Sequence, residues 1–178
     1  MIKIACNSSP IIGLCIIKKL DLLWKLFDEI YITEEVYREI VQSNELKHYG
    51  ERELINAVED NKIIVYKVKN SEFVEAMIAR LHRGELEVIQ AARELNISRV
   101  IIDDRPARNR AKDMLLKPIG IIGILQLAKQ LGKIDEIKAY LDILIQENYR
   151  ISKKLYLEAL KVASEEERIF ESRWFQII

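Results

Sequence analysis

Apolar positions along the chain fall into short continuous runs separated by longer stretches with helical spacing. The short runs are bounded by polar residues and are typical of buried strands; we expect strands over residues 2–6, 30–32, 62–68, 99–102 and 117–119. In the longer stretches, apolar residues recur three or four positions apart, the spacing of amphipathic helices. The predicted helices cover residues 10–19, 21–27, 34–42, 51–60, 71–81, 85–95, 106–115, 121–131, 135–146 and 152–167. This alternation is typical of an α/β fold with a parallel sheet and helices on both faces.

Capping residues and glycines mark several of the expected element ends. Ser8 or Ser9 is a good N-cap for the first helix, with Pro10 at the first helical position. Thr33 is expected to cap the helix that follows the second strand. Gly84 is expected to break the helical pattern before the helix over 85–95. The strands therefore pass into the following helices through short polar connections.

The composition is that of one domain with a sizeable core. The chain has 178 residues, 49% of them hydrophobic, which is enough to bury a single core. The 28 basic and 28 acidic residues balance, so nucleic acid must be bound by a local patch rather than by the field of the whole protein. Cys6 and Cys15 have no metal-type spacing and lie in apolar stretches, which indicates buried, reduced thiols. There is no signal-peptide pattern and no apolar run of transmembrane length, so we expect a cytoplasmic protein without membrane contact.

Candidate chemistry concentrates where two of the predicted strands end. The fourth strand runs into Asp103 and Asp104, and the first strand ends at Asn7. In open parallel sheets, ligands bind outside the carboxyl ends of the strands. Carboxylates at that edge can hold a divalent cation, and the neighbouring Arg105 and Arg108 can hold phosphate. One of the two aspartates is expected to cap the next helix, which leaves the other without that structural explanation.

Three glutamates are further candidates. Glu85 heads the apolar stripe of the helix over 85–95, whereas Glu87 points away from that stripe. A carboxylate at the start of a buried face must be paired, protonated or bound to a cation, and the ordinary alternative is a first-turn glutamate that interacts with the helix dipole. Glu39 flanks the apolar face of the helix over 34–42, where a solvated surface acid is the alternative. Of these three glutamates, Glu85 is therefore the strongest candidate for a site residue.

Several segments, taken together, resemble the PIN-domain family. Their order and spacing are more specific than any one of them. They are Asn7-Ser8-Ser9-Pro10, Leu20-Asp21-Leu22-Leu23 and residues 32–40, 84–89 and 100–105. Residues 120–134 and Tyr149-Arg150-Ile151-Ser152 resemble one prokaryotic, toxin-like PIN subfamily. The resemblance implies a PIN-like domain over residues 1–163 and leaves residues 164–178 as a helical, apolar C-terminal extension.

The resemblance implies a Rossmann-like three-layer α/β/α sandwich with a central, mostly parallel sheet of four to five strands. It also implies a ribonuclease in which acids at the carboxyl edge of the sheet bind Mg²⁺ or Mn²⁺. The family's acids, in order along the chain, fall on Asn7, on Glu39, on Glu85 or Glu87, and on Asp103 or Asp104. Helix spacing in the family slightly favours Glu87 as the third acid, whereas the apolar stripe of this chain favours Glu85.

The same resemblance implies a role for each of these residues. Asn7, Glu85 and Asp103 are expected to form the catalytic group, with hydrolysis of a phosphodiester assisted by a cation. The residues expected to contact RNA are Ser8, Ser9, Arg105 and Arg108. The expected partners are RNA, an antitoxin-type protein and a second copy of the chain.

Asn7 departs from the family pattern, because an acid normally anchors the metal there. An amide oxygen can ligate Mg²⁺ but carries no charge to hold it.

Two functions stay open: a weakened ribonuclease, such as the toxin of a toxin–antitoxin pair, and a non-catalytic PIN-shaped module that binds nucleic acid or protein. A phosphatase or receiver-like domain that uses Asp103 ranks last, because such proteins place the key acid after the first strand. The apolar tail over 164–178 either packs on the domain's own core or covers a dimer partner.

Overall fold

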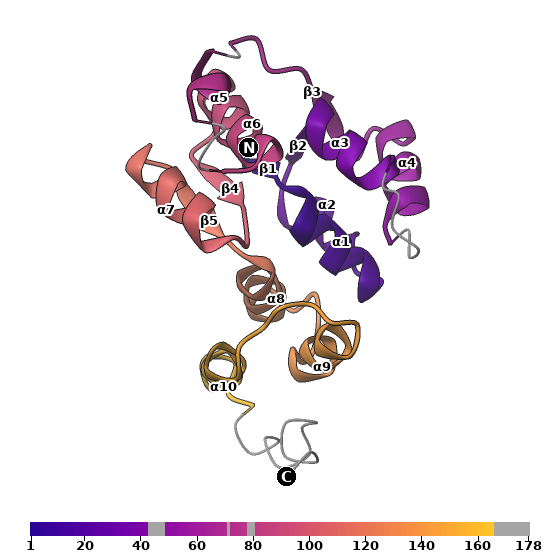
Figure 1. Cartoon of the computed structure of the whole chain (residues 1–178). Helices are drawn as coiled ribbons and strands as arrows, with labels where there is room; N and C mark the ends of the chain where they lie inside the picture. The colour runs from indigo at the N-terminus through magenta and orange to yellow at the C-terminus, as the bar shows by residue number, and fades with distance from the viewer. Residues whose placement is uncertain (43–48, 71, 78–80, 166–178) are drawn as a thin grey trace.

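A five-stranded parallel sheet forms the centre of the computed structural model (Figure 1). The structure describes residues 1–42, 49–70, 72–77 and 81–165. The strands within this part of the chain are β1 (Lys3–Cys6), β2 (Glu29–Thr33), β3 (Ile64–Tyr66), β4 (Arg99–Ile101) and β5 (Lys117–Ile119). Their order is β3-β2-β1-β4-β5, and every neighbouring pair is parallel. The expected α/β class and strand number are therefore confirmed, with a sheet that is wholly rather than mostly parallel.

Helices flank this sheet. They are α1 (Ser8–Ile16), α2 (Leu22–Leu26), α3 (Glu34–Val41), α4 (Glu51–Glu59), α5 (Glu72–Met77), α6 (Arg83–Glu94), α7 (Arg105–Asp113), α8 (Ile121–Gln130), α9 (Lys138–Gln146) and α10 (Lys153–Val162). The chain moves outward from β1 to β3, then returns across the sheet to β4 and β5. Because parallel crossovers are right-handed, this reversal places α1–α4 and α5–α7 on opposite faces, the arrangement seen in Figure 1. α8 and α9 then pack against α1.

The core lies around β1 and β4, the strands nearest the middle of the sheet. Ile4, Cys6, Val100 and Ile101 are all buried, as expected for parallel strands covered on both faces. α6 crosses this region and contacts β1, β2 and β4. The carboxyl ends of β1 and β4 are therefore held side by side by a packed core.

Both cysteines are buried and free, which confirms the prediction from their apolar surroundings. Burial raises the pKa of the Cys6 thiol well above its ordinary value, and the nearby Asp103 carboxylate raises it further. Burial also raises the pKa of Cys15 to about 12. Both side chains are therefore protonated at neutral pH and act as small apolar groups of the core.

Two helix starts differ from the sequence-based expectation. α1 begins at Ser8 with Asn7 at the N-cap position, so Pro10 occupies the third helical position. Proline is tolerated there because the first-turn N–H groups have no intrahelical acceptor. Gly84 does not break a helix but lies in the first turn of α6. A Cβ on Gly84 would lie 2.5 Å from Oε1 of Glu39, so glycine allows α3 and α6 to approach closely.

Other element ends agree with the sequence or lie outside the described residues. Thr33 caps α3 as expected, since its hydroxyl accepts a hydrogen bond from the Val36 N–H at 3.2 Å. Three parts of the chain lie outside the described residues: 43–48, positions 71 and 78–80 of the helix expected over 71–81, and 166–178 of the extension expected over 164–178. Within the part that the structure describes, none of the helices combines the length and apolar character needed to span a bilayer.

Glu94 ties the segment after β3 to the end of α6. Its carboxylate accepts hydrogen bonds from the backbone N–H groups of Lys69 at 3.0 Å and Asn70 at 2.9 Å. It also accepts bonds from the Tyr66 hydroxyl at 2.9 Å and the Gln90 amide at 2.9 Å. Desolvation acts to raise the pKa of Glu94, but these four donors outweigh it and lower the pKa to about 2.

Substituting Glu94→Gln is expected to reduce the free energy of unfolding by about 1–2 kcal/mol at pH 7, after allowing for solvent screening of a partly exposed group. Because folding lowers the pKa of Glu94, its carboxylate stabilises the protein at pH values above the ordinary pKa of 4.5. This stabilisation is lost as the pH falls toward 2. The difference between the two proteins, measured by urea denaturation, should therefore shrink below about pH 4.5. Glu59→Gln, on the exposed face of α4, is the matched control; an equal loss of stability there would contradict the assignment.

Candidate active site at the carboxyl edge of the sheet

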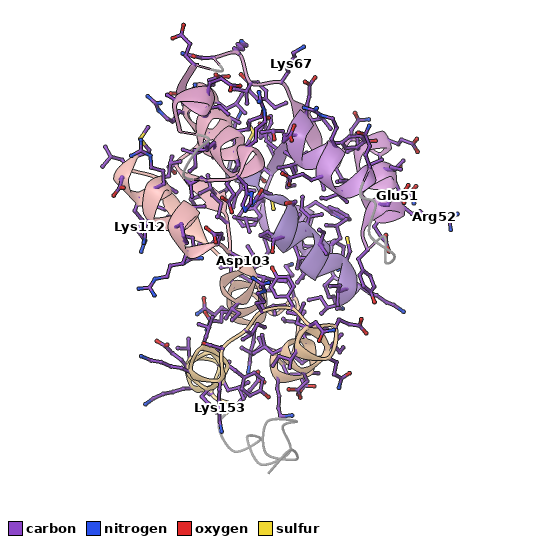
Figure 2. The ribbon with its side chains drawn as sticks, viewed as in Figure 1. Glu51, Arg52, Lys67, Asp103, Lys112 and Lys153 are labelled. Carbon is purple, nitrogen blue, oxygen red and sulfur yellow. The ribbon has the colours of Figure 1, made fainter. Side chains whose placement is uncertain are left out.

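A cavity opens where the order of the sheet reverses, at the carboxyl ends of β1 and β4. Chain connections lead away from these neighbouring strands in opposite directions, which leaves a crevice between them. The backbone N–H of Asn7 donates to the carbonyl of Ile101 at 3.0 Å and joins the two strand ends. The cavity, of about 690 Å³, is lined by the candidate residues Asn7, Ser8, Ser9, Glu85, Asp103, Asp104 and Arg105, among others. Figure 2 shows Asp103 near the centre of the view, whereas Lys67, Lys112 and Lys153 lie at the periphery.

Asn7 presents a buried polar atom without a partner. Its backbone is extended, with φ −85° and ψ 167°, and its side chain makes no capping hydrogen bond to α1. The residue is only 5% exposed, and Oδ1 has no hydrogen-bond partner among the described residues. A buried oxygen left in this state costs about 1–3 kcal/mol. The Asn7 side chain is therefore better suited to contact a bound group than to support the helix.

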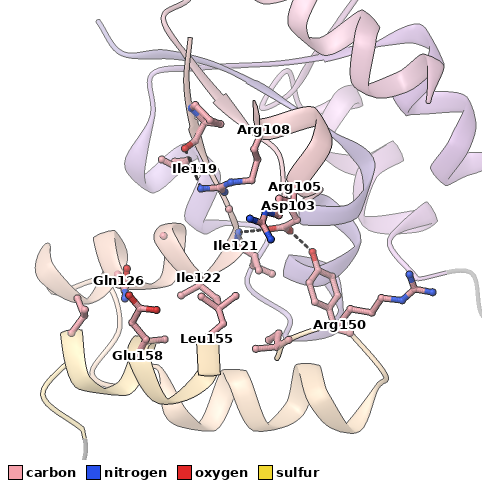
Figure 3. A pocket seen from close by; sticks show the side chains of 17 residues that line it. Asp103, Arg105, Arg108, Ile119, Ile121, Ile122, Gln126, Arg150, Leu155 and Glu158 are labelled. Carbon is pink, nitrogen blue, oxygen red and sulfur yellow. Dashed lines mark hydrogen bonds between the residues drawn. The ribbon is translucent and has the colours of Figure 1, made fainter. Parts of the chain in front are cut away.

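Asp103 is held at both carboxylate oxygens. Oδ1 accepts a hydrogen bond from the backbone N–H of Ile121 at 2.9 Å, and Oδ2 accepts one from the hydroxyl of Tyr149 (Figure 3). Burial raises the pKa of Asp103, while Tyr149, the Ile121 N–H and the Arg108 guanidinium act to lower it. The carboxylate is thereby fixed between the end of β4, the start of α8 and the connection from α9 to α10.

Asp104 and Asp103 divide the two roles that the sequence left open. Asp104 is the N-cap of α7, where Oδ1 accepts a hydrogen bond from the Ala107 N–H at 2.9 Å. Its side chain is exposed and also lines the cavity. Because one acid is enough to cap α7, the position of Asp103 is not explained by the helix.

Of the two predicted RNA-binding arginines, Arg108 has structural contacts and Arg105 is exposed. The guanidinium of Arg108 donates to the carbonyls of Ile102 at 3.1 Å and Pro118 at 3.5 Å. It thus joins the connection after β4 to β5. A Cβ on Gly120 would collide with Oδ1 of Asp103 and lie 3.0 Å from this guanidinium, so glycine is needed for the group to assemble.

Glu85 and Glu87 are both buried, at 6% and 8% exposure, so the expectation that Glu87 points away from the buried side was only partly right. Glu87 forms an ion pair with Arg83 at 3.1 Å, and Arg83 also pairs with Glu75 of α5 at 2.9 Å. Glu85 lines the cavity and accepts a hydrogen bond from the His82 N–H at 3.2 Å. This is the capping-box contact of a first-turn glutamate. Burial, followed by the charge of Asp104, raises the pKa of Glu85.

Glu39 lies beside the cavity rather than among the residues that line it. Its side chain is exposed and rests against Gly84 at the start of α6. Desolvation by the adjoining helices raises its pKa, and a hydrogen bond from Ser8 acts to lower it. The contacts with Ser8 and Gly84 place Glu39 between the N-termini of α1 and α6.

Tyr149 is a site residue for which sequence reasoning assigned no role. Its hydroxyl contacts both Asp103 and the hydroxyl of Ser9, the latter at 3.0 Å. Burial and the Asp103 charge raise the pKa of this phenol, so it stays protonated and donates. A Cβ on Gly13 would lie 2.8 Å from the Tyr149 ring, so the tyrosine reaches the site only because α1 has a glycine there. In the sequence, the only signal for this residue was the resemblance of the Tyr149-Arg150-Ile151-Ser152 segment to a PIN subfamily, and that resemblance indicated no contact with Asp103.

The oxygen-bearing side chains that line the cavity are of the kind that divalent cations bind, but they do not form a preformed acidic centre. In the described part of the chain, no three His, Cys, Asp or Glu side chains are grouped so as to hold a metal ion. A ligand set here must include the amide oxygen of Asn7, which is an acceptable ligand for Mg²⁺ but is neutral. Burial raises the pKa values of both Glu85 and Asp103, and the Asn7 oxygen has no hydrogen-bond partner among the described residues.

The order of the strands and the polar cavity at the reversal point define a Rossmann-like α/β domain with a candidate phosphate- and cation-handling site. The chain belongs to the PIN-domain family, because a family model described as a PIN domain matches residues 3–165. The resemblance seen in the sequence is thereby confirmed for the family and for the fold. A search of curated proteins and a search of solved structures found no match.

Proposed function

We propose that this chain is a metal-dependent ribonuclease of the PIN type, with weak affinity for Mg²⁺ or Mn²⁺. The observation that carries the proposal is the unpartnered, buried oxygen of Asn7 in a cavity that also contains Glu85, Asp103 and Asp104. Oxygen ligands converging at the carboxyl edge of a parallel sheet suit a hard divalent cation. The proposal extends to a toxin role with a protein partner, which the resemblance implies for many prokaryotic PIN proteins.

The residues that would hold the cation are Asn7, Asp103, Glu85 and Asp104. A divalent cation at such a site neutralises phosphate charge and makes water more acidic. Tyr149 and the Ile121 N–H keep the Asp103 carboxylate oriented.

The start of α1 and Arg105, the first residue of α7, supply the contacts to RNA. Ser8 and Ser9 line the cavity at the N-terminus of α1, where free N–H groups and the helix dipole favour an anion. Arg105 is exposed and also lines the cavity, so its guanidinium can bind a flanking phosphate. These contacts are made to the backbone, which positions RNA without requiring a particular base.

A second candidate function is a PIN-shaped module that binds RNA without cutting it. The observation in its favour is that Glu85, Asp103 and Asp104 each already accept a hydrogen bond from the protein. A cation must therefore compete with these donors, and Asn7 contributes no charge to help it. This candidate predicts RNA binding that is insensitive to chelators.

The two candidates are separated by incubating a labelled single-stranded RNA with the protein in Mn²⁺ and, in parallel, in EDTA. A ribonuclease is expected to cut in Mn²⁺ and not in EDTA, with weak Mn²⁺ binding by isothermal titration calorimetry. Gel-shift binding that persists in EDTA without any cleavage would instead establish the binding module. Failure to bind or cut any RNA would overturn both candidates.

A further inference from the structure

A second cavity, here called the side cavity, opens beside the candidate active site. It has a volume of about 530 Å³ and lies between the start of α8, the end of β5 and α10 (Figure 3). Both cavities are lined by Asp103, Arg105, Tyr149 and Arg150. The two cavities therefore adjoin at Asp103 and Tyr149, which are hydrogen-bonded to each other.

We propose that the side cavity binds the base of a nucleotide next to the scissile phosphate of single-stranded RNA, with a preference for guanine. This inference rests on the proposed function and names the substrate feature that the site reads. It is carried by three zones of the side cavity: a cationic mouth, an apolar middle and a polar far end. Their order matches the phosphate, the ring face and the edge of a nucleotide.

The mouth of the side cavity is cationic. Arg105 is exposed there, and Arg108 is fixed beside it by its bonds to backbone carbonyls. Arg150 also lines the cavity, but its guanidinium points away from those of Arg105 and Arg108 (Figure 3). The chain as a whole has no net charge, so this cluster of guanidinium groups is a local feature. Guanidinium groups bind phosphate oxygens with well-defined geometry. A phosphate held at this mouth would lie between the two cavities.

The middle of the side cavity exposes large apolar side chains to water. Leu155 of α10 is 44% exposed, and Ile122 of α8 lies on the facing wall; Val162, which also lines the cavity, lies one turn of α10 beyond Glu158. Figure 3 shows Ile122 and Leu155 between the arginines and the far end. Exposed apolar groups in a concave site are covered favourably by the face of a flat ring. A nucleobase is such a ring and remains connected to the phosphate at the mouth.

The far end of the side cavity carries an amide and a carboxylate. Figure 3 shows Gln126 of α8 and Glu158 of α10 at the same end. A carboxylate accepts hydrogen bonds at two oxygens, and an amide can donate to a carbonyl. Guanine offers two adjacent N–H donors and a carbonyl oxygen along its pairing edge. Adenine, cytosine and uracil offer fewer donors side by side, so this pair of side chains favours guanine.

The test measures binding of fluorescein-labelled single-stranded RNA by fluorescence anisotropy, in EDTA so that cleavage does not interfere. An eight-nucleotide oligouridylate is compared with the same oligomer carrying one central guanosine, adenosine or cytidine. The guanosine oligomer is expected to bind about tenfold more tightly, and Glu158→Gln is expected to abolish that preference. Leu155→Ala should weaken binding of all four oligomers alike, whereas Glu59→Gln on α4 should change nothing.

The outcomes separate this inference from the proposed function. A guanosine preference that Glu158→Gln removes supports the side cavity as a base site. Equal binding of all four oligomers, or a preference that survives Glu158→Gln, overturns the base site while leaving a Mn²⁺-dependent ribonuclease intact. Absence of binding to every oligomer, together with absence of cleavage in Mn²⁺, overturns the proposed function and the base site together.

Discussion

Substituting Asn7→Asp is expected to strengthen Mn²⁺ binding about ten- to a hundredfold and to raise the rate of RNA cleavage. A carboxylate about 4 Å from a cation contributes several kcal/mol of attraction at an effective dielectric constant of about 20, counted per unit charge. The cost of burying that carboxylate offsets part of this gain, and a net effect of about 1.4–2.8 kcal/mol corresponds to the stated range. Calorimetric titration with Mn²⁺ and cleavage of labelled RNA measure the two effects.

The same substitution should destabilise the protein when no cation is present. Asn7 is buried in a cavity that also contains Glu85, Asp103 and Asp104, so a new carboxylate is desolvated and repelled by like charges. Thermal unfolding of the Asn7→Asp protein in EDTA is expected at a lower temperature than that of the wild type, and Mn²⁺ should reverse the difference.

Asn7→Ala is the matched control for Asn7→Asp, because it removes the amide oxygen without adding charge. It should bind Mn²⁺ less tightly than the wild type. If Asn7→Asp neither binds Mn²⁺ more tightly nor cuts faster than Asn7→Ala, the cation site does not lie at the end of β1. That result would favour the RNA-binding module.

Asp103→Ala is expected to reduce RNA cleavage at least about a hundredfold, the scale seen when groups that hold or orient a metal are removed. It should also lower the free energy of unfolding by about 2 kcal/mol, since the Ile121 N–H and the Tyr149 hydroxyl lose their acceptor. Cleavage assays and urea denaturation measure these effects separately.

Asp103→Asn separates the loss of charge from the loss of structure. The amide can still accept a hydrogen bond from Ile121, so stability should stay close to that of the wild type while cleavage falls as in Asp103→Ala. Tyr149→Phe should then cost less stability in the Asp103→Ala background than alone, because the two groups contact one another. Full cleavage by Asp103→Asn would show that the charge of Asp103 is not used.

Local chemistry made much of the fold predictable. The runs of apolar residues that became β1 and β4 are bounded by polar residues, and Thr33 signals the start of α3 through its own hydroxyl. Each of these signals depends on neighbours within a few residues along the chain, which is the range at which periodicity and capping act. The place of the candidate site was also predictable, because the carboxyl ends of parallel strands lie at the same edge of the sheet.

The composition of the cavity was predictable only in part. Asn7, Ser8, Ser9 and Asp103 follow strands directly, so strand assignment was enough to place them at the edge. Glu85 and Glu87 were harder to distinguish because both are buried in α6, which packs against α3 and α5 as well as against the sheet. That packing is a tertiary contact, and the pattern within α6 does not encode it.

By itself, the sequence determined the α/β alternation, the polar residues at the ends of β1 and β4, and the departure of Asn7 from the acid of its family. Only the tertiary structure decided which groups meet there. Tyr149 reaches Ser9 across 140 positions of the chain and Asp103 across 46, with Gly13 leaving room for its ring. Periodicity and capping act between near neighbours, whereas the partners of a buried oxygen depend on how distant elements pack. For that reason the unpartnered Asn7 oxygen and the side cavity became visible only in the folded chain.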